Sequence, residues 1–167
     1  SAGSEPGPAC YGRGGTEPTV TDADLALGKI DAKNFAGGTI PIDAAKAATA
    51  LMHAVGTKLA MPLETAAIGV SEIIDENMAN AARVHAVERG EAVAERTLIA
   101  FGGAAPLHAS RLAEKLGIKR IVVPADAGVG SAIGFLAAPA AYEMIRSTYM
   151  RLDRFDALAA NALIDDM

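Results

Sequence analysis

The stretch that decides the fold is "TLIAFGGAAPLHASRLAEKLGIKRIVVP", residues 97–124. Its first part, 97–101, is a short apolar run of the length that is typical of a buried strand. A helical pattern follows over 105–116, and a second short apolar run occupies 121–123. A strand, a helix and a strand in so few residues predict a βαβ unit, whose two strands are parallel because a crossover helix connects them.

The helix of this unit carries boundary signals at both ends. Pro106 suits a first helical turn, where no intrahelical amide donor is needed. Gly117 suits the left-handed position that follows the last turn. Gly102 and Gly103 join the first strand to the helix, and two interpretations stay open: a clamp for a phosphate or nucleotide, or a tight turn. The G-x-G-x-x-G spacing of a dinucleotide site and the G-K-[ST] ending of a P-loop are both missing.

The residues before this unit predict a helical hairpin. Asp43 is a suitable N-cap for a helix over 44–59, where apolar residues recur at spacings of three and four. A longer helix with an apolar stripe is predicted from Pro62 to Gly90. The fold class is therefore predicted to be α/β, with a helical hairpin followed by the βαβ unit.

Composition and charge exclude several classes of function. The 167 residues carry a formal net charge of -5, and the basic residues are scattered, which argues against a nucleic-acid-binding surface. No segment reaches the roughly 18 to 20 apolar residues that a membrane span needs. Cys10 is the sole cysteine, so no internal disulfide forms, and we expect a cytoplasmic protein.

Two aspartates and one histidine are the candidate polar site residues. Asp22 and Asp24 stand in "TVTDADLALG", where a carboxylate could position water or a magnesium ion. The alternative is a capping box in which Thr21 caps a short helix and Asp24 is its partner, which leaves Asp22 as the candidate catalytic residue. His108 lies in the first turn of the helix after the glycines, where local packing is the simpler interpretation. No histidine spacing is typical of a metal site, so no metal ligand is assigned.

Four blocks of sequence, in this order and at these spacings, resemble one family. They are "GPACYGRGGTEPTVTDADLALGKID" at 7–31, "ENMANAARVHAVERG" at 76–90, the stretch at 97–124 and "AGVGSAIGFLAAP" at 127–139. Together they resemble the ATP-dependent hydantoinase/5-oxoprolinase family, specifically its hydantoinase A subunit. The resemblance extends from Gly7 to Leu152.

The resemblance implies a nucleotide-dependent enzyme. Members of the family hydrolyse cyclic amides of the hydantoin or 5-oxoproline type with ATP, and phosphoryl transfer to the carbonyl oxygen would activate the amide for attack by water. The family's core is similar to the actin-like and sugar-kinase-like ATPase fold, in which a Gly-Gly turn contacts the adenosine. Gly102, Gly103 and Ala104 are thereby expected to bind the nucleotide, with ATP and Mg²⁺ as cofactors.

The resemblance also implies that the chain is part of a larger assembly. The family's Asp-x-Gly-Gly-Thr phosphate loop is missing, so 1–152 are expected to be a partial actin-like ATPase domain and 153–167 the start of a truncated element. We therefore expect the chain to supply the adenosine side of the cleft and to be inactive alone. The expected partners are a cyclic amide substrate and a hydantoinase B-type subunit, in an oligomer.

Three alternatives to cyclic amide hydrolysis stay open. A related branch of the family supplies the first, a ketone carboxylase subunit. A sugar-kinase-like phosphotransferase with the same core is the second. The third is not an enzyme: a helical interaction module in which Gly102 and Gly103 serve only as a turn.

Overall fold

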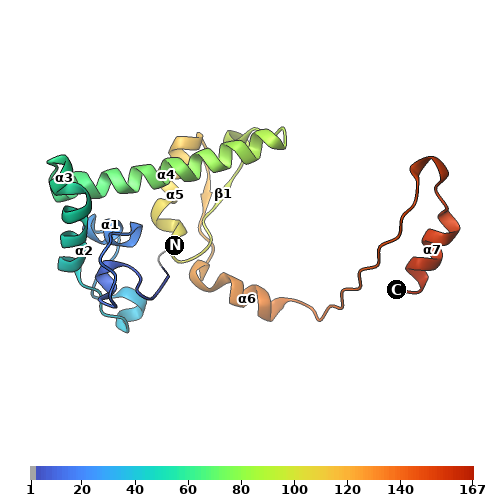
Figure 1. Ribbon diagram of the computed structural model, residues 1–167, viewed down its shortest axis with the longest axis horizontal. Coiled ribbons are helices and arrows are strands. Elements are labelled where there is room, and N and C mark those ends of the chain that lie inside the picture. Colours follow the sequence, from blue (N-terminus) through green and yellow to red (C-terminus); the bar gives the residue numbers. More distant parts are fainter. Residues whose placement is uncertain (1–2) are drawn as a thin grey trace. The chain divides into compact units, whose positions relative to one another are not determined.

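The computed structural model describes residues 3–167 and divides into two units, Ser1–Gly130 and Ser131–Met167. Over the described residues the helices are α1 (Val20–Ala26), α2 (Ala44–Leu51), α3 (Thr57–Leu59), α4 (Leu63–Glu88), α5 (Ala105–Leu116), α6 (Gly130–Ala137) and α7 (Ala157–Asp165), and the strands are β1 (Leu98–Ile99) and β2 (Ile121–Val122) (Figure 1). Short 3-10 segments lie at Ala9–Tyr11, Phe35–Gly38, Val93–Glu95, Ala127–Val129 and Leu152–Arg154, and a π-helical turn covers Met52–Gly56. The chain is thus a mixed helical structure with a small parallel sheet.

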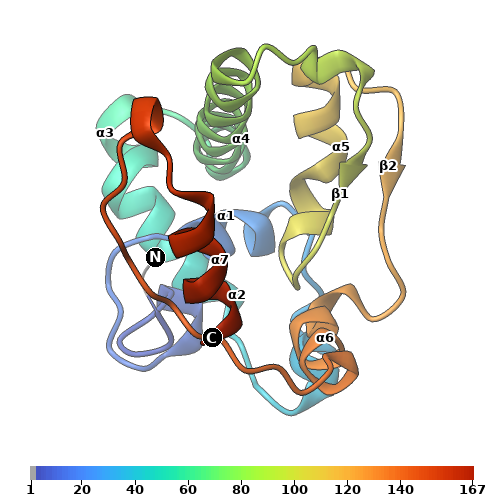
Figure 2. The same ribbon diagram turned by 90° about the vertical axis from the view of Figure 1, so that its right-hand side faces the viewer.

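The predicted βαβ unit is confirmed, but the expectation of a buried strand over 97–101 is wrong, because Ile99 of β1 is exposed, as are Ile121 and Val122 of β2. β1 and β2 are parallel neighbours, with Leu98 paired to Ile121 and Ile99 to Val122, and α5 lies between them in the sequence (Figure 2). The helix ends before Gly117, whose φ of 70° is left-handed, as predicted. The two strands are shorter than the apolar runs at 97–101 and 121–123. Only the pairs Leu98–Ile121 and Ile99–Val122 form the ladder.

The two helices of the predicted hairpin are present as α2 with its continuation and α4, but they run across each other rather than side by side (Figures 1 and 2). Asp43 caps α2, because its carboxylate accepts the backbone N–H of Ala45 at 2.8 Å and of Lys46 at 3.2 Å. Helical conformation continues through the π-helical turn and α3 to Ala60, whose positive φ of 51° ends it. α4 then runs for 26 residues (Figure 1), and α1 packs against both α2 and α4. α1, α2 and α4 therefore form a three-helix group.

α1 begins with a capping box that differs from the predicted one. The N-cap is Thr19, whose hydroxyl accepts the N–H of Asp22 at 3.4 Å, while the Asp22 carboxylate accepts the N–H of Thr19 at 2.8 Å. The prediction that Thr21 caps the helix with Asp24 as its partner is therefore wrong. The physical reason is that Asp22 also accepts the N–H of Cys10 at 2.8 Å, which ties the start of the helix to the preceding loop.

Alanine supplies much of the core in residues 3–130. Ala23 of α1, Leu51 of α2 and Ala67 of α4 are fully buried and form one cluster. A second cluster joins Leu25 of α1 to Ala47 of α2. Because alanine side chains are short, these three helices approach one another closely, and an added methylene has little room.

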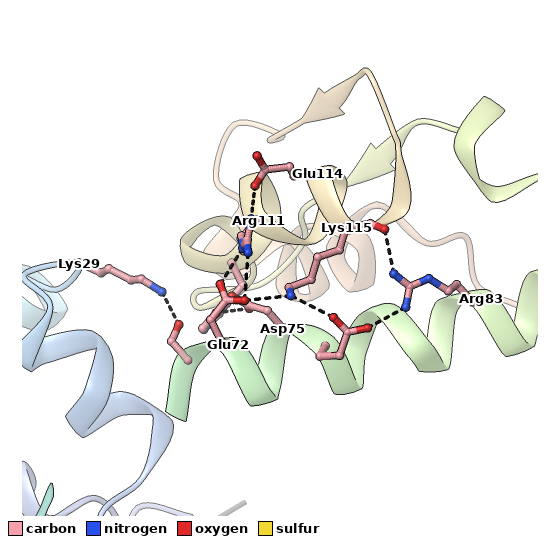
Figure 3. A network of polar contacts seen from close by, with 10 residues as sticks. Lys29, Glu72, Asp75, Arg83, Arg111, Glu114 and Lys115 are labelled. Carbon is pink, nitrogen blue, oxygen red and sulfur yellow. Dashed lines mark hydrogen bonds and ion pairs between the residues drawn. The ribbon is translucent and has the colours of Figure 1, made fainter. Parts of the chain in front are cut away.

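Charged side chains join α4 to α5 along the exposed side of their contact (Figure 3). Glu72 accepts from Nε of Arg111 at 2.6 Å and from Nζ of Lys115 at 2.9 Å. Lys115 also donates to Glu76 at 3.0 Å, and Arg83 donates to Glu76 at 2.9 Å and to the carbonyl of Lys115 at 2.8 Å. The hydrogen bonds from Arg111 and Lys115 lower the pKa of Glu72 from 4.5 to about 2. The stability of the contact between α5 and α4 therefore depends in part on pH and salt.

Residues 131–167 form the smaller unit. They contain most of α6, the 3-10 segment Leu152–Arg154 and α7. Asp156 caps α7 by accepting the backbone N–H groups of Leu158 and Ala159, each at 3.0 Å. The domain boundary predicted after residue 152 stays a prediction.

Ala67→Leu is expected to lower the free energy of unfolding by about 1–3 kcal/mol, because leucine adds volume where Ala67 meets Ala23 and Leu51. Urea denaturation of the purified chain measures the change. The matched control is Ala81→Leu, at an exposed position of the same helix, which should stay within about 0.5 kcal/mol of the parent. An unchanged urea midpoint for Ala67→Leu would contradict the close approach of α1, α2 and α4.

Glu72→Gln is expected to flatten the acid side of the stability curve. Folding lowers the pKa of Glu72 from 4.5 to about 2, so the ionised carboxylate stabilises the folded state above pH 4.5, and this contribution is lost as the pH falls toward 2. Glutamine lacks the contribution at every pH, so the variant loses less stability across that window. Thermal unfolding at steps between these two pH values measures the slope.

The partner variant Arg111→Gln is the matched test of the same contact. It removes the larger cause of the lowered pKa of Glu72 and should flatten the slope in the same direction. Equal slopes in the parent and in both variants would show that the ion pair contributes nothing in solution.

Candidate functional site

The turn between β1 and α5 exposes backbone at the start of a helix. Gly102 has a φ of 110°, a conformation that side chains rarely adopt, and its N–H donates to the carbonyl of Ala127 at 2.9 Å. A β-carbon on Gly103 would meet no atom within 4 Å, so the space beside this residue is open. Ala104 is the N-cap of α5 and offers no side chain to the first amides of the helix. The turn therefore presents uncapped N–H groups next to open space.

A cavity of about 510 Å³ lies against this turn. Its lining includes Tyr11, Asp24, Lys29, Phe35, Gly103 and Ala104. The rings of Tyr11 and Phe35 are in contact, with centroids 5.8 Å apart. The volume falls in the range of small-molecule sites, and the lining combines aromatic surface with a few charged groups. Two of the three residues predicted to bind a nucleotide, Gly103 and Ala104, thus lie together on a cavity wall.

Asp22 is fully buried and does not line this cavity. Its carboxylate accepts the backbone N–H of Ala9 at 3.2 Å and of Cys10 at 2.8 Å, in addition to its capping contacts with Thr19. Burial and the contact with Asp22 raise the pKa of the Cys10 thiol to about 12, so this buried cysteine is a weak nucleophile. The catalytic role of Asp22 stays a prediction, while its contacts hold the loop that precedes Tyr11.

Asp24 lies instead in a buried polar network that joins α1, α4 and α5. Its Oδ2 lies 3.1 Å from Nε2 of His108, and Nδ1 of the same ring lies 2.9 Å from Oδ1 of Asp75. The exposed fractions of Asp24, His108 and Asp75 are 2%, 7% and 1%. Nζ of Lys29 lies 3.1 Å from Oδ1 of Asp24 and donates to the hydroxyl of Ser71 at 2.8 Å. Local packing alone, the interpretation favoured for His108, is therefore incomplete, because two carboxylates hold the ring.

The network could not be found from apolar periodicity. α4 has five buried residues: Ala66, and Ala67, Ser71, Asp75 and Ala79 at intervals of four. Two of the five are polar. The apolar stripe predicted for this helix was chosen from apolar residues, so it leaves out Ser71 and Asp75. The signal in the sequence was a serine and an aspartate flanked by alanines at helical spacing, which is unusual for a solvated face.

Two kinds of feature are absent from residues 3–167. No group of three or more His, Cys, Asp or Glu side chains in this range is placed to hold a metal ion. No helix in the same range is long and apolar enough to cross a membrane.

Comparison with known proteins identifies relatives that share both sequence and structure. The caprolactamase subunit alpha of Pseudomonas jessenii is 39% identical over 153 residues, which are 92% of this chain and 22% of that protein. The acetophenone carboxylase gamma subunit of Aromatoleum aromaticum is 44% identical over 125 residues, which are 75% of this chain and 17% of that protein. The crystal structure of the ATP-dependent caprolactamase from Pseudomonas jessenii matches with a TM-score of 0.73 at 40% identity, over 80% of this chain and 19% of that chain.

The chain thus spans about a fifth of the length of these curated relatives. Residues 1–144 also match the model of a family described as hydantoinase/oxoprolinase. This match covers most of the chain and confirms the family that the four sequence blocks predicted. The chain belongs to the hydantoinase/oxoprolinase family.

Proposed function

We propose that this chain supplies the adenosine side of the nucleotide cleft in an ATP-dependent enzyme that hydrolyses a cyclic amide. The observation that carries the proposal is the cavity beside the Gly-Gly turn, which Gly103 and Ala104 line together with Tyr11 and Phe35. Its support from outside the chain is the likeness to a caprolactamase described as ATP-dependent.

The cavity suits the base and sugar of a nucleotide for three reasons. The aromatic pair Tyr11–Phe35 offers apolar surface for a purine ring. The open space beside Gly103 lets a ligand reach the backbone, which a side chain there would prevent. The uncapped amides at Ala104 favour oxygen acceptors of the ligand. Gly102 does not line the cavity, and we propose that its positive φ shapes the turn that presents Gly103 and Ala104.

Bound ATP would supply the phosphoryl group that activates the amide carbonyl oxygen for attack by water. The residues of this chain bind and orient the nucleotide, and Asp22 holds the Ala9–Cys10 backbone that carries Tyr11 to the cavity. Among residues 3–167 no group of three or more His, Cys, Asp or Glu side chains is placed to hold a metal ion, and the Mg²⁺ predicted with ATP stays a prediction. We propose that the actin-like ATPase fold and the phosphate side of the cleft are completed outside this chain.

A ketone carboxylase is the second candidate function. The observation in its favour is the 44% identity to a protein named as the gamma subunit of acetophenone carboxylase. Both relatives are named as subunits, which supports the proposal that the whole protein works in an oligomer with a hydantoinase B-type partner. The cytoplasmic location stays a prediction.

Substrate profiling of the full-length protein with its partner subunit separates the two functions. A cyclic amide hydrolase is expected to form ADP in step with ring opening of a lactam, a hydantoin or 5-oxoproline, without bicarbonate. A carboxylase is expected to consume ATP only when both a ketone and bicarbonate are present. Ring opening without ATP would contradict the first proposal, and the 167-residue chain alone is expected to show neither activity.

Gly103→Val is expected to raise the KM for ATP roughly ten-fold in the full-length protein, which corresponds to about 1.4 kcal/mol of binding. The valine side chain would occupy the open space beside the turn, while the backbone, whose φ at Gly103 is not positive, accepts it. Steady-state kinetics at saturating substrate measure the change. Gly102→Val is a poorer test, because its φ of 110° would strain any side chain there.

The matched control is Gly69→Val, at an exposed position of α4 where a β-carbon also meets no atom within 4 Å. Its KM for ATP should equal that of the parent. If Gly103→Val binds ATP as the parent does, the adenosine site lies elsewhere.

A further inference from the structure

The His108 ring has a carboxylate oxygen close to each of its two nitrogens, which is more than a neutral ring can satisfy. Nε2 lies 3.1 Å from a carboxylate oxygen of Asp24, and Nδ1 lies 2.9 Å from a carboxylate oxygen of Asp75. A neutral imidazole has one N–H donor and one lone-pair acceptor, so one of its nitrogens would face an acceptor of the same kind. Two ionised carboxylates are both satisfied only when both ring nitrogens carry protons.

The charges of the network lead to the same proton count. Asp24 and Asp75 bring two negative charges into a region where both side chains are buried. Lys29 brings one positive charge to Asp24 at 3.1 Å, and a doubly protonated His108 brings the second, so the group is neutral. A neutral ring would leave an uncompensated negative charge away from water, which is costly.

The position of the ring connects this network to the proposed nucleotide cavity. His108 lies in the first turn of α5, four residues after Ala104, so holding the ring fixes the turn that carries Gly103 and Ala104. Asp24, which holds one side of the ring, also lines the cavity. Asp75 holds the other side from α4, near the contacts that Figure 3 shows between α4 and α5. One buried ring thus joins two walls of the cavity to the long helix.

We propose that His108 is a positioning residue for the nucleotide and that it acts as an imidazolium held between Asp24 and Asp75. The charged ring fixes the distance between the α1 wall and the Gly103–Ala104 wall. Together with Lys29, it compensates the two buried carboxylates, one of which, Asp24, lines the cavity. This inference rests on the proposed function for the identity of the ligand. The double protonation of His108 does not depend on it.

The test is a double-mutant cycle in the full-length protein. In His108→Gln the side-chain amide donates to one carboxylate only, and its carbonyl oxygen faces the other, so the KM for ATP should rise roughly ten-fold with kcat little changed. Asp75→Asn supplies the missing donor. The double variant His108→Gln/Asp75→Asn should therefore recover most of the affinity that His108→Gln loses, and Asp75→Asn alone should raise the KM less than His108→Gln.

A purely packing role for His108 makes the opposite prediction. Asp75→Asn changes no volume, so the two effects on the KM would add and the double variant would be no better than His108→Gln. Additive effects, or an unchanged KM in His108→Gln where Gly103→Val raises it, overturn the proposal. The matched control is His85→Gln, at an exposed position of α4, which should leave the KM for ATP unchanged.

The same cycle measured by urea unfolding separates this proposal from the proposed function. If ATP does not use the cavity, Gly103→Val leaves the KM unchanged, but recovery of stability by the second substitution still supports the imidazolium. If His108→Gln yields no folded protein, the comparison is made in the yield of soluble protein. Recovery of that yield in the double variant supports the proposal, and no recovery contradicts it.

Discussion

The contact on which the arrangement of α1, α4 and α5 depends is the His108 ring between two buried carboxylates. Apolar packing sets how closely helices approach, but it is not directional, and a core of small side chains offers few shapes that specify one register. A ring with a partner on each nitrogen allows one orientation. The Gly103–Ala104 turn at the start of α5 and the Asp24 wall on α1 are thereby placed relative to each other.

The elements that the sequence predicted correctly are those with local signals. Asp43 at the start of α2 and Gly117 at the end of α5 act on backbone groups within a few residues, so their roles follow from the residue type alone. The parallel pairing of β1 and β2 follows from the short crossover between them. In α1 the same reasoning chose the wrong pair, because the Asp22 carboxylate also binds the backbone of Cys10, which local rules do not include.

The site was predictable on one side only. Gly103 and Ala104 are found from a strand, a glycine pair and a helix, which are adjacent in the sequence. Tyr11 and Phe35 reach the cavity from a glycine-rich loop whose path is set by tertiary contacts, and nothing in their spacing indicates that they meet. The sequence did not predict the role of Asp75 for a different reason. A charged residue on a helix is usually solvated, and its partner His108 lies on another helix.

The alanine core has a consequence for how this protein can be studied. Ala23, Ala47, Ala67 and Ala79 are all fully buried, so the positions that hold the helices together are already the residue to which a scanning experiment would convert them. Alanine scanning would leave these four positions untouched and would reach the interior only at its few larger side chains, such as Leu25 and Leu51. A scan that introduces larger side chains would map the interior, because here crowding, rather than truncation, is the perturbation that the packing resists.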